Sequence, residues 1–326
     1  MLVAALMVIA GLALLVWSSD RFVAGASAIA WNLGVSPLVI GLTIVGFGTS
    51  APEMLVSAIA AWQGNPNVGV GNAIGSNIAN IALILGVTAL VRRIDVHSRL
   101  LRLEMPILLA VTLGAYFLLL DRVLGRLDGA LLLGTLLAIM AWLVHDALTG
   151  RRHDIMAGEF AGELPRHMPL GRAVLWFVVG LVVLLVSARM VVWGAVHIAQ
   201  ALGVSDLVIG LTIVAIGTSL PELSASITAA LRGESDLAVG NVVGSNLFNL
   251  LAVMAMPGLI THTPVPAAVL WRDYPLMAAL TLLLWLIAFS FVSRRPHINR
   301  AEGLLLVAGF AGYQYLLLHG NMTPGP

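Results

Sequence analysis

The sequence contains no cysteine and no lysine, and it has few charged residues of any kind. Without cysteine there are no disulfide bonds and no thiolate metal sites. Charged residues make up only 10% of the 326 positions, whereas 60% are hydrophobic and the mean hydropathy is +0.99. A soluble domain carries about 25% charged residues. The composition therefore excludes a soluble globular protein and indicates an integral membrane protein.

Apolar segments long enough to cross a bilayer recur along the whole chain. A membrane-spanning helix needs about 20 apolar residues, and a span that is not a helix must belong to a closed barrel. These segments lack the alternation of barrel strands. We therefore expect an all-α membrane protein with ten transmembrane helices, near residues 2–18, 36–62, 67–91, 103–120, 127–148, 171–198, 205–231, 236–260, 273–292 and 302–319.

All seventeen basic residues are arginine, and their distribution predicts an orientation. Basic residues gather in the cytoplasmic loops of membrane proteins. With ten helices and the N-terminus outside, thirteen arginines, including Arg21, fall on the inner side and four fall on the outer side. We therefore expect both termini outside. A composition rich in Ala, Leu and Gly, with arginine as its only basic residue, is typical of a GC-rich bacterial genome, so we expect the inner membrane of a bacterium.

The chain contains an internal repeat. Residues 34–80 align without a gap with residues 203–249, and 27 of the 47 positions are identical at a fixed offset of 169. This offset spans five predicted helices, an odd number, so the second copy must be inverted in the membrane. Inverted repeats build secondary transporters whose substrate site lies where the halves meet. We expect a first repeat over 1–148, a cytoplasmic linker over 149–172 and a second repeat over 173–326.

The polar residues of each repeat fall at helical spacing on two successive helices. The first helix of each copy carries a hydroxyl and carboxylate face: Thr49, Ser50, Glu53 and Ser57, repeated as Thr218, Ser219, Glu222 and Ser226. The next helix carries Asn72, Ser76 and Asn80, repeated as Asn241, Ser245 and Asn249. Every one of these side chains offers oxygen, which favours a hard cation over zinc, copper or iron.

Prolines beside the two glutamates predict further oxygen ligands. A proline inside a helix leaves the carbonyl four residues earlier without its amide donor. Pro52 and Pro221 would free carbonyls in this way, and the nearby carbonyls of Gly46 and Ala215 are additional candidate ligands. Unpaired backbone at membrane depth is tolerated only where it lines a cavity or is buried in protein. The repeats therefore predict a polar site inside the membrane.

The two glutamates explain why such a site would exchange ions. An intramembrane carboxylate marks an ion pathway by default, and two neighbouring carboxylates repel each other unless cations balance them. One Ca²⁺ between Glu53 and Glu222, or several Na⁺ ions, would balance the charge. An empty site would leave two uncompensated charges, so the empty carrier should not reorient. This predicts obligatory exchange.

At these motifs, G-T-S-A-P-E with G-N-A-I-G-S-N-I-A-N and G-T-S-L-P-E with G-N-V-V-G-S-N-L-F-N, the chain resembles the calcium/cation antiporter superfamily, specifically prokaryotic sodium/calcium exchangers. The resemblance implies ten helices in an inverted 5+5 arrangement and gating by sliding of the long first and sixth helices. It also implies Ca²⁺ held by Glu53, Glu222 and the carbonyls of Thr49 and Thr218. Sodium would use these with Ser50, Ser219, Ser76, Ser245 and the carbonyls of Gly46 and Ala215.

Position 249 bears on the coupling ion. Potassium-dependent relatives carry Asp there, whereas this chain has Asn249, matching Asn80 in the first repeat. The residues favour Ca²⁺/Na⁺ antiport, with Ca²⁺/H⁺ antiport as the alternative and a cation channel as a weaker one. No Ser/His pair or HExxH pattern indicates an enzyme. We expect no cofactor, no nucleic acid and no obligate protein partner.

Five charged positions outside the repeated motifs have ordinary structural interpretations. Glu104 and Asp273, each two residues before a proline, are predicted to cap helices. Asp20, Arg21 and Arg189 are expected near helix ends and not as ligands.

Overall fold

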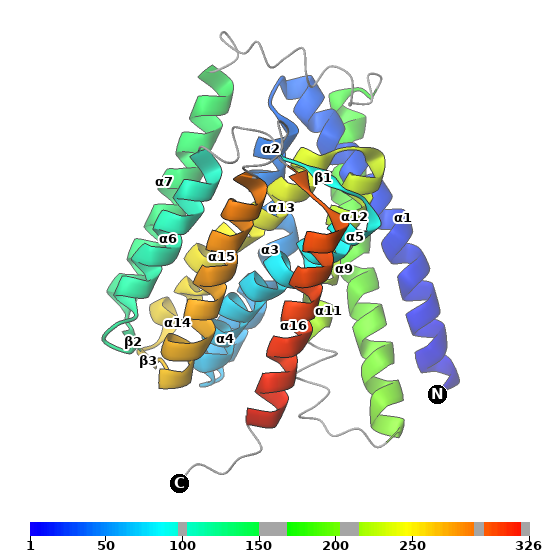
Figure 1. The fold of residues 1–326 in the computed structure, drawn as a ribbon. Helices are drawn as coiled ribbons and strands as arrows, with labels where there is room; N and C mark the ends of the chain where they lie inside the picture. The colour runs from blue at the N-terminus through cyan, green and yellow to red at the C-terminus, as the bar shows by residue number, and fades with distance from the viewer. Residues whose placement is uncertain (97–102, 150–167, 203–214, 290–296, 321–326) are drawn as a thin grey trace.

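The computed structural model describes residues 1–96, 103–149, 168–202, 215–289 and 297–320, which are almost entirely helical (Figure 1). The first half contains α1 (Leu2–Leu33), α2 (Pro37–Ile40), the π-helix η1 (Gly41–Val45), α3 (Gly46–Trp62), α4 (Pro66–Ile78), the π-helix η2 (Ala79–Leu85), α5 (Gly86–Val91), β1 (Ile94–Asp95), α6 (Met105–Leu118), β2 (Val123–Leu124) and α7 (Arg126–Thr149). The second half contains α9 (Leu170–Ala201), α11 (Ala215–Thr218), α12 (Leu220–Arg232), α13 (Ser235–Phe248), the π-helix η6 (Asn249–Val253), α14 (Ala255–Ile260), β3 (Thr263–Pro264), the π-helix η7 (Val269–Asp273), α15 (Tyr274–Phe289), β4 (His297–Ile298) and α16 (Arg300–Gly320).

Seven helical spans in the described part of the chain are long and apolar enough to cross a membrane: Leu2–Leu33, Pro37–Trp62, Pro66–Val91, Arg126–Asp146, Leu170–Ala201, Ser235–Ile260 and Val269–Ile287. Helix α6 is shorter but also apolar. Helices α12 and α16 correspond to the two remaining predicted spans. The chain is therefore a helical membrane protein. The predicted linker falls mostly on 150–167, outside the described residues.

Helix α1 is much longer than the sequence predicted. It continues to Leu33 and ends at Gly34, whose φ of 63° is the left-handed conformation that glycine adopts readily. The prediction that Arg189 lies near a helix end is wrong, because it is inside α9, and the same prediction for Asp20 and Arg21 is wrong too. Both charges lie inside α1 because neighbouring helices satisfy them: Asp20 pairs with Arg232, and the Arg21 guanidinium lies 4.9 Å from the ring centre of Trp176.

Helices α1 and α9 cross each other as an antiparallel pair along one edge of the molecule (Figure 1). Glycines bring the two backbones together. A Cβ atom at Gly25 would come within 2.5 Å of the Phe177 amide nitrogen, and one at Gly180 within 2.5 Å of the Phe22 amide nitrogen. Any side chain at these two positions would separate the helices.

Helix α13 occupies the centre of the structure. Every residue from Asp236 to Phe248 is buried, and the helix packs against η1 and α3 from the first half. A Cβ at Gly244 would come within 2.5 Å of the Leu42 carbonyl oxygen, and one at Gly46 within 3.1 Å of the Ser245 amide nitrogen. This close approach places the polar face of α13 against that of α3.

Two short antiparallel strand pairs connect the halves at the helix ends. β1 pairs with β4, with Ile94 opposite Ile298, and β2 pairs with β3, with Val123 opposite Pro264. The first residues of β1 and β3, Ile94 and Thr263, differ by the repeat offset of 169 (263 − 94).

The predicted caps at Glu104 and Asp273 are wrong. Glu104 already has helical backbone angles and makes no capping hydrogen bond, and Asp273 is the last residue of η7. Because the chain is π-helical before each proline, no free helix start remains to be capped. The Asp273 carboxylate instead accepts hydrogen bonds from Arg272 and from the Tyr313 hydroxyl.

Candidate cation site

The two glutamates of the repeated motifs are buried in the interior and close enough to interact. Glu53 lies within α3 and Glu222 in the first turn of α12, and they are only 1% and 2% exposed. Glu222 interacts electrostatically with Glu53 and with the Thr49 side chain. None of the described arginine or histidine side chains is buried. Two acidic groups thus share an interior without a basic partner among the described residues.

The helix carrying Glu53 presents its hydroxyls to the second half of the chain. Thr49 and Ser50, one turn before Glu53, are both fully buried. The Thr49 hydroxyl lies 3.3 Å from the Ser245 hydroxyl and 3.2 Å from the side-chain oxygen of Asn241, both on α13. The structure therefore brings Thr49, Glu222 and Ser245 together, as the inverted-repeat reasoning expected of residues far apart in sequence.

The two amide candidates lie where their helices change to π-helical geometry. Asn80 is the second residue of η2 and Asn249 is the first residue of η6, and each is 1% exposed. Ser76 lies four residues before Asn80 on α4, and Ser245 lies four residues before Asn249 on α13. Short π-helical segments occur frequently at functional sites because they loosen the backbone hydrogen-bond pattern.

Five buried side-chain oxygens of the predicted ligand set have no hydrogen-bond partner among the described residues. They are Ser50 Oγ, Glu53 Oε2, Asn80 Oδ1, Glu222 Oε2 and Asn249 Oδ1. A buried polar atom without a partner is unfavourable by about 1–3 kcal/mol, and more for a charged group. Such atoms in a native structure need an explanation, and a bound ion is one of them. All five are oxygens and come from both halves, and oxygen is the ligand type that a hard cation takes.

Asn72 and Asn241 lie four residues before Ser76 and Ser245. Each donates a hydrogen bond to the main-chain carbonyl of a glutamate. The Asn72 amide donates to the Glu53 main-chain carbonyl (3.4 Å), and the Asn241 amide donates in the same way to the Glu222 carbonyl (3.3 Å). Asn241 also accepts from Thr49, so it connects the two halves. The sequence identified these residues by their spacing but did not reveal this supporting role.

Other polar residues of the motifs hold the helices together. The Ser57 hydroxyl donates to the Val253 carbonyl (2.7 Å), and Ser226 accepts from the Asn241 amide (2.9 Å). Asn77 and Asn246, which are repeat equivalents outside the predicted ligand set, have the same role. The Asn77 amide donates to the Asn246 carbonyl (3.3 Å), and the Asn80 amide donates to the Asn246 side-chain oxygen (3.0 Å). Their identity at the repeat offset was the available signal.

The two proline sites differ from each other. Pro52 lies inside α3, as predicted, whereas the second copy breaks at Ser219, between α11 and α12. Pro221 therefore lies in the first turn of α12, where its missing amide interrupts no helix. Ser219 is buried, and Thr218 and Ala215 lie on α11, which packs against α4.

The donor set suits a hard cation. No group of three or more His, Asp or Glu side chains gathers within the described part of the chain. Two carboxylates with hydroxyl, amide and carbonyl oxygens are the ligands that Ca²⁺ and Na⁺ take, whereas zinc and copper favour imidazole or thiolate.

Comparison with known proteins agrees with this chemistry. The sequence profile of the family described as "Sodium/calcium exchanger protein" matches residues 3–145 and 172–319. This chain belongs to the sodium/calcium exchanger family. Among the similar members of the exchanger family, CaxA of Alkalimonas amylolytica is 50% identical over 317 residues, covering 97% of this chain and 99% of CaxA. The inner membrane protein YrbG of Escherichia coli K12 is 41% identical over 312 residues, covering 95% of each chain.

A solved structure of an exchanger has the same fold. The sodium-calcium exchanger NCX_Mj, in crystals soaked without Na⁺ and Ca²⁺, superposes with a TM-score of 0.82 at 32% identity, covering 99% of both chains. The resemblance to prokaryotic sodium/calcium exchangers is therefore confirmed. The family is one of membrane transporters, so the chain is a cation antiporter of the sodium/calcium exchanger type.

Proposed function

We propose that this protein exchanges Ca²⁺ for Na⁺ by alternating access, with Glu53 and Glu222 carrying the charge of the site. The observation that carries the proposal is the set of five buried oxygens without partners, contributed by both repeats and including one oxygen of each glutamate. A Ca²⁺ ion would neutralise both carboxylates and collect the six to eight oxygens that it prefers. Several Na⁺ ions would use the same oxygens.

An inverted arrangement of two five-helix repeats supports alternating access. The contacts of the α1–α9 pair repeat when each residue is exchanged for its partner at offset 169. Gly11 meets Val191 and Gly180 meets Phe22, where 180 − 11 and 191 − 22 are both 169. If replacing every residue by its repeat equivalent gives the same contacts, the two repeats are related by a two-fold axis. A pair of inverted repeats can adopt two states that the two-fold axis interchanges, and each state opens the midplane site to one side of the membrane.

The arginine distribution supports termini on the outside of a bacterial inner membrane. Since Arg21 and Arg189 lie inside α1 and α9, they no longer count toward the bias, which leaves twelve predicted inner and three predicted outer arginines (13 − 1 and 4 − 1). The excess of arginines on the predicted cytoplasmic side therefore remains.

Sodium, without potassium, is the proposed coupling ion. With Asn at both 80 and 249, the formal charge of the site comes from two glutamates alone. One Ca²⁺ balances that charge, and two or more Na⁺ match or exceed it. An Asp at position 249 would add a third negative charge and favour an additional cation, unless it stayed protonated.

The test is Ca²⁺ uptake into proteoliposomes preloaded with Na⁺, K⁺ or H⁺ in turn. Uptake driven by Na⁺ alone is expected. Asn249→Asp should change the ion dependence, whereas Thr43→Ser, outside the proposed ligand set, should not. Strict dependence on K⁺, or equal uptake driven by a proton gradient, would overturn the coupling assignment. Ca²⁺ flux without any opposing ion would indicate a channel.

A further inference from the structure

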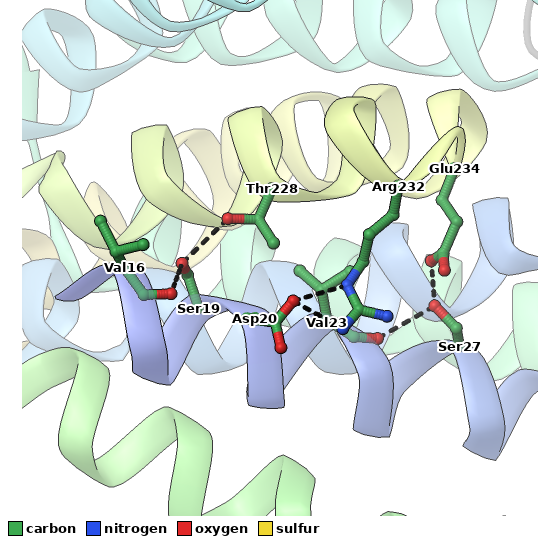
Figure 2. Close-up of polar contacts among 8 residues, drawn as sticks. All are labelled: Val16, Ser19, Asp20, Val23, Ser27, Thr228, Arg232 and Glu234. Carbon is green, nitrogen blue, oxygen red and sulfur yellow. Dashed lines mark hydrogen bonds and ion pairs between the residues drawn. The ribbon is translucent and has the colours of Figure 1, made fainter. Parts of the chain in front are cut away.

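Helix α1 contacts α12 through a row of three polar side-chain pairs outside the cation site (Figure 2). The hydroxyls of Ser19 and Thr228 are 2.9 Å apart. Two nitrogens of Arg232 lie 2.9 Å and 2.6 Å from Asp20 Oδ1. Two helical turns further along α1, the Ser27 hydroxyl hydrogen-bonds the Glu234 carboxylate just after α12 ends. We call these three pairs the α1–α12 strip.

The repeat equivalents of the strip cannot form the same contacts. At offset 169, Ser19, Asp20 and Ser27 become Ala188, Arg189 and Val196 on α9. Thr228, Arg232 and Glu234 become Ile59, Gln63 and Asn65 at the end of α3 and just beyond it. A contact between α9 and α3 of the same geometry would therefore have no ion pair and no carboxylate. The strip exists in one half of the molecule only.

The face of α12 that carries the strip and the equivalent face of α3 also differ in how far neighbouring helices cover them. On α12, Ser224 is 8% exposed and its hydroxyl donates to the Leu15 carbonyl of α1 (3.4 Å). The equivalent residue on α3, Leu55, is 51% exposed, and Ile59 one turn later is 46% exposed. The α1–α9 pair thus covers α12 and leaves the equivalent face of α3 uncovered.

From these observations we infer that the Asp20–Arg232 pair, with its flanking hydroxyl contacts, is a latch that holds the exchanger in the state closed between α1 and α12. In a molecule with perfect internal symmetry, the two states of alternating access would have equal free energy. Bonds made in one state and impossible in the other shift that equilibrium by the free energy of those bonds alone. Asp20 and Arg232 therefore act on the transport cycle without touching the ion.

The strip lies along the C-terminal half of α1 and at the C-terminal end of α12. The arginine bias predicts that this side is cytoplasmic. The latch then keeps the cytoplasmic entrance closed and the external one open when no ion gradient acts.

The absence of cysteine allows a direct test, because a single introduced thiol is the only one in the chain. Ser224→Cys and Leu55→Cys are matched reporters related by the repeat offset. A water-soluble maleimide should label Ser224→Cys slowly in purified protein, because α1 covers this position, and Leu55→Cys gives the labelling of the equivalent position on α3. Adding Asp20→Asn or Arg232→Gln should raise the labelling rate at Ser224→Cys two- to fivefold, the range expected for a partly exposed ion pair.

Two controls separate the latch from a general effect on folding. Exchanging the charges, with Asp20→Arg and Arg232→Asp together, should return labelling toward the original rate. Arg189→Gln, the repeat equivalent of position 20, should leave labelling unchanged. Unchanged labelling at Ser224→Cys in both single variants, or no recovery in the exchanged pair, would overturn the latch.

The inference depends on the proposed alternating access, and the same assay distinguishes the two failures. Saturating Na⁺ or Ca²⁺ should change labelling at the reporter positions if the carrier alternates. If the ions change labelling but Asp20→Asn does not, the latch is wrong and the transport mechanism stands. If neither ions nor latch variants change labelling, alternating access itself fails.

Discussion

Replacing either glutamate with glutamine tests the charge balance of the site. Glu53→Gln or Glu222→Gln keeps the size and one oxygen but leaves one of the two charges of Ca²⁺ unbalanced in a site whose carboxylates are 1% and 2% exposed. Removing one partner of a buried charge pair is unfavourable by about 3–5 kcal/mol. At tenfold for each 1.4 kcal/mol, Ca²⁺ binding should weaken by about 10²–10³-fold or more.

The assay is Na⁺-driven Ca²⁺ uptake in proteoliposomes, with Ca²⁺ binding to the purified protein measured by calorimetry. The matched control is Glu302→Gln. Glu302 lies in the first turn of α16 and forms a capping box with Asn299, which glutamine preserves, so this variant should exchange normally. Wild-type exchange by either Glu53→Gln or Glu222→Gln would refute the assignment of the pair as the ion site.

Three other outcomes follow from the packing, the orientation and the carboxylates. Gly244→Ala should destabilise the protein by about 1–3 kcal/mol in thermal unfolding, because its Cβ would meet the Leu42 carbonyl at 2.5 Å, whereas Gly114→Ala meets nothing within 4 Å and should be neutral. A reporter fused after Pro326 should read as external and one inserted at 151–172 as cytoplasmic; the reverse would contradict the inverted topology. Exchange measured across a pH series should fall as the pH is lowered, because protons compete with cations for the two carboxylates, and a flat profile would contradict carboxylate ligands.

The grouping of the candidate site residues was predictable because its information is local and repeated. Glu53 with Thr49 and Ser50 lies within one helical turn, so spacing alone places these residues on one face. The identical set 169 residues later then implies that two such faces meet. The structure places Thr49 beside Ser245 and Glu222 near Glu53, as this reasoning requires.

The contacts between the two halves depend on which residues of one half lie opposite which residues of the other. Residue spacing within one half carries no information about this. Asn241 was recognised as an oxygen donor, but its bond to Thr49 depends on the contact between α13 and α3. The same holds for Ser57 and the Val253 carbonyl. The length of α1 was underestimated because Asp20 and Arg21 were interpreted as a helix end, when their partners lie far away in sequence.

The candidate cation site is made of repeat-equivalent residues, whereas the contact between α1 and α12 is not. Equivalent residues are expected at the site if an ion bound between two inverted repeats must remain liganded in both states. Glu53 and Glu222 have the same support, each receiving an asparagine amide on its main-chain carbonyl. The contact between α1 and α12 would have no such constraint, because the proposed latch forms in one state and breaks in the other. Differences such as Asp20 against Arg189 can therefore accumulate there, and they set which state is favoured without altering which ion binds.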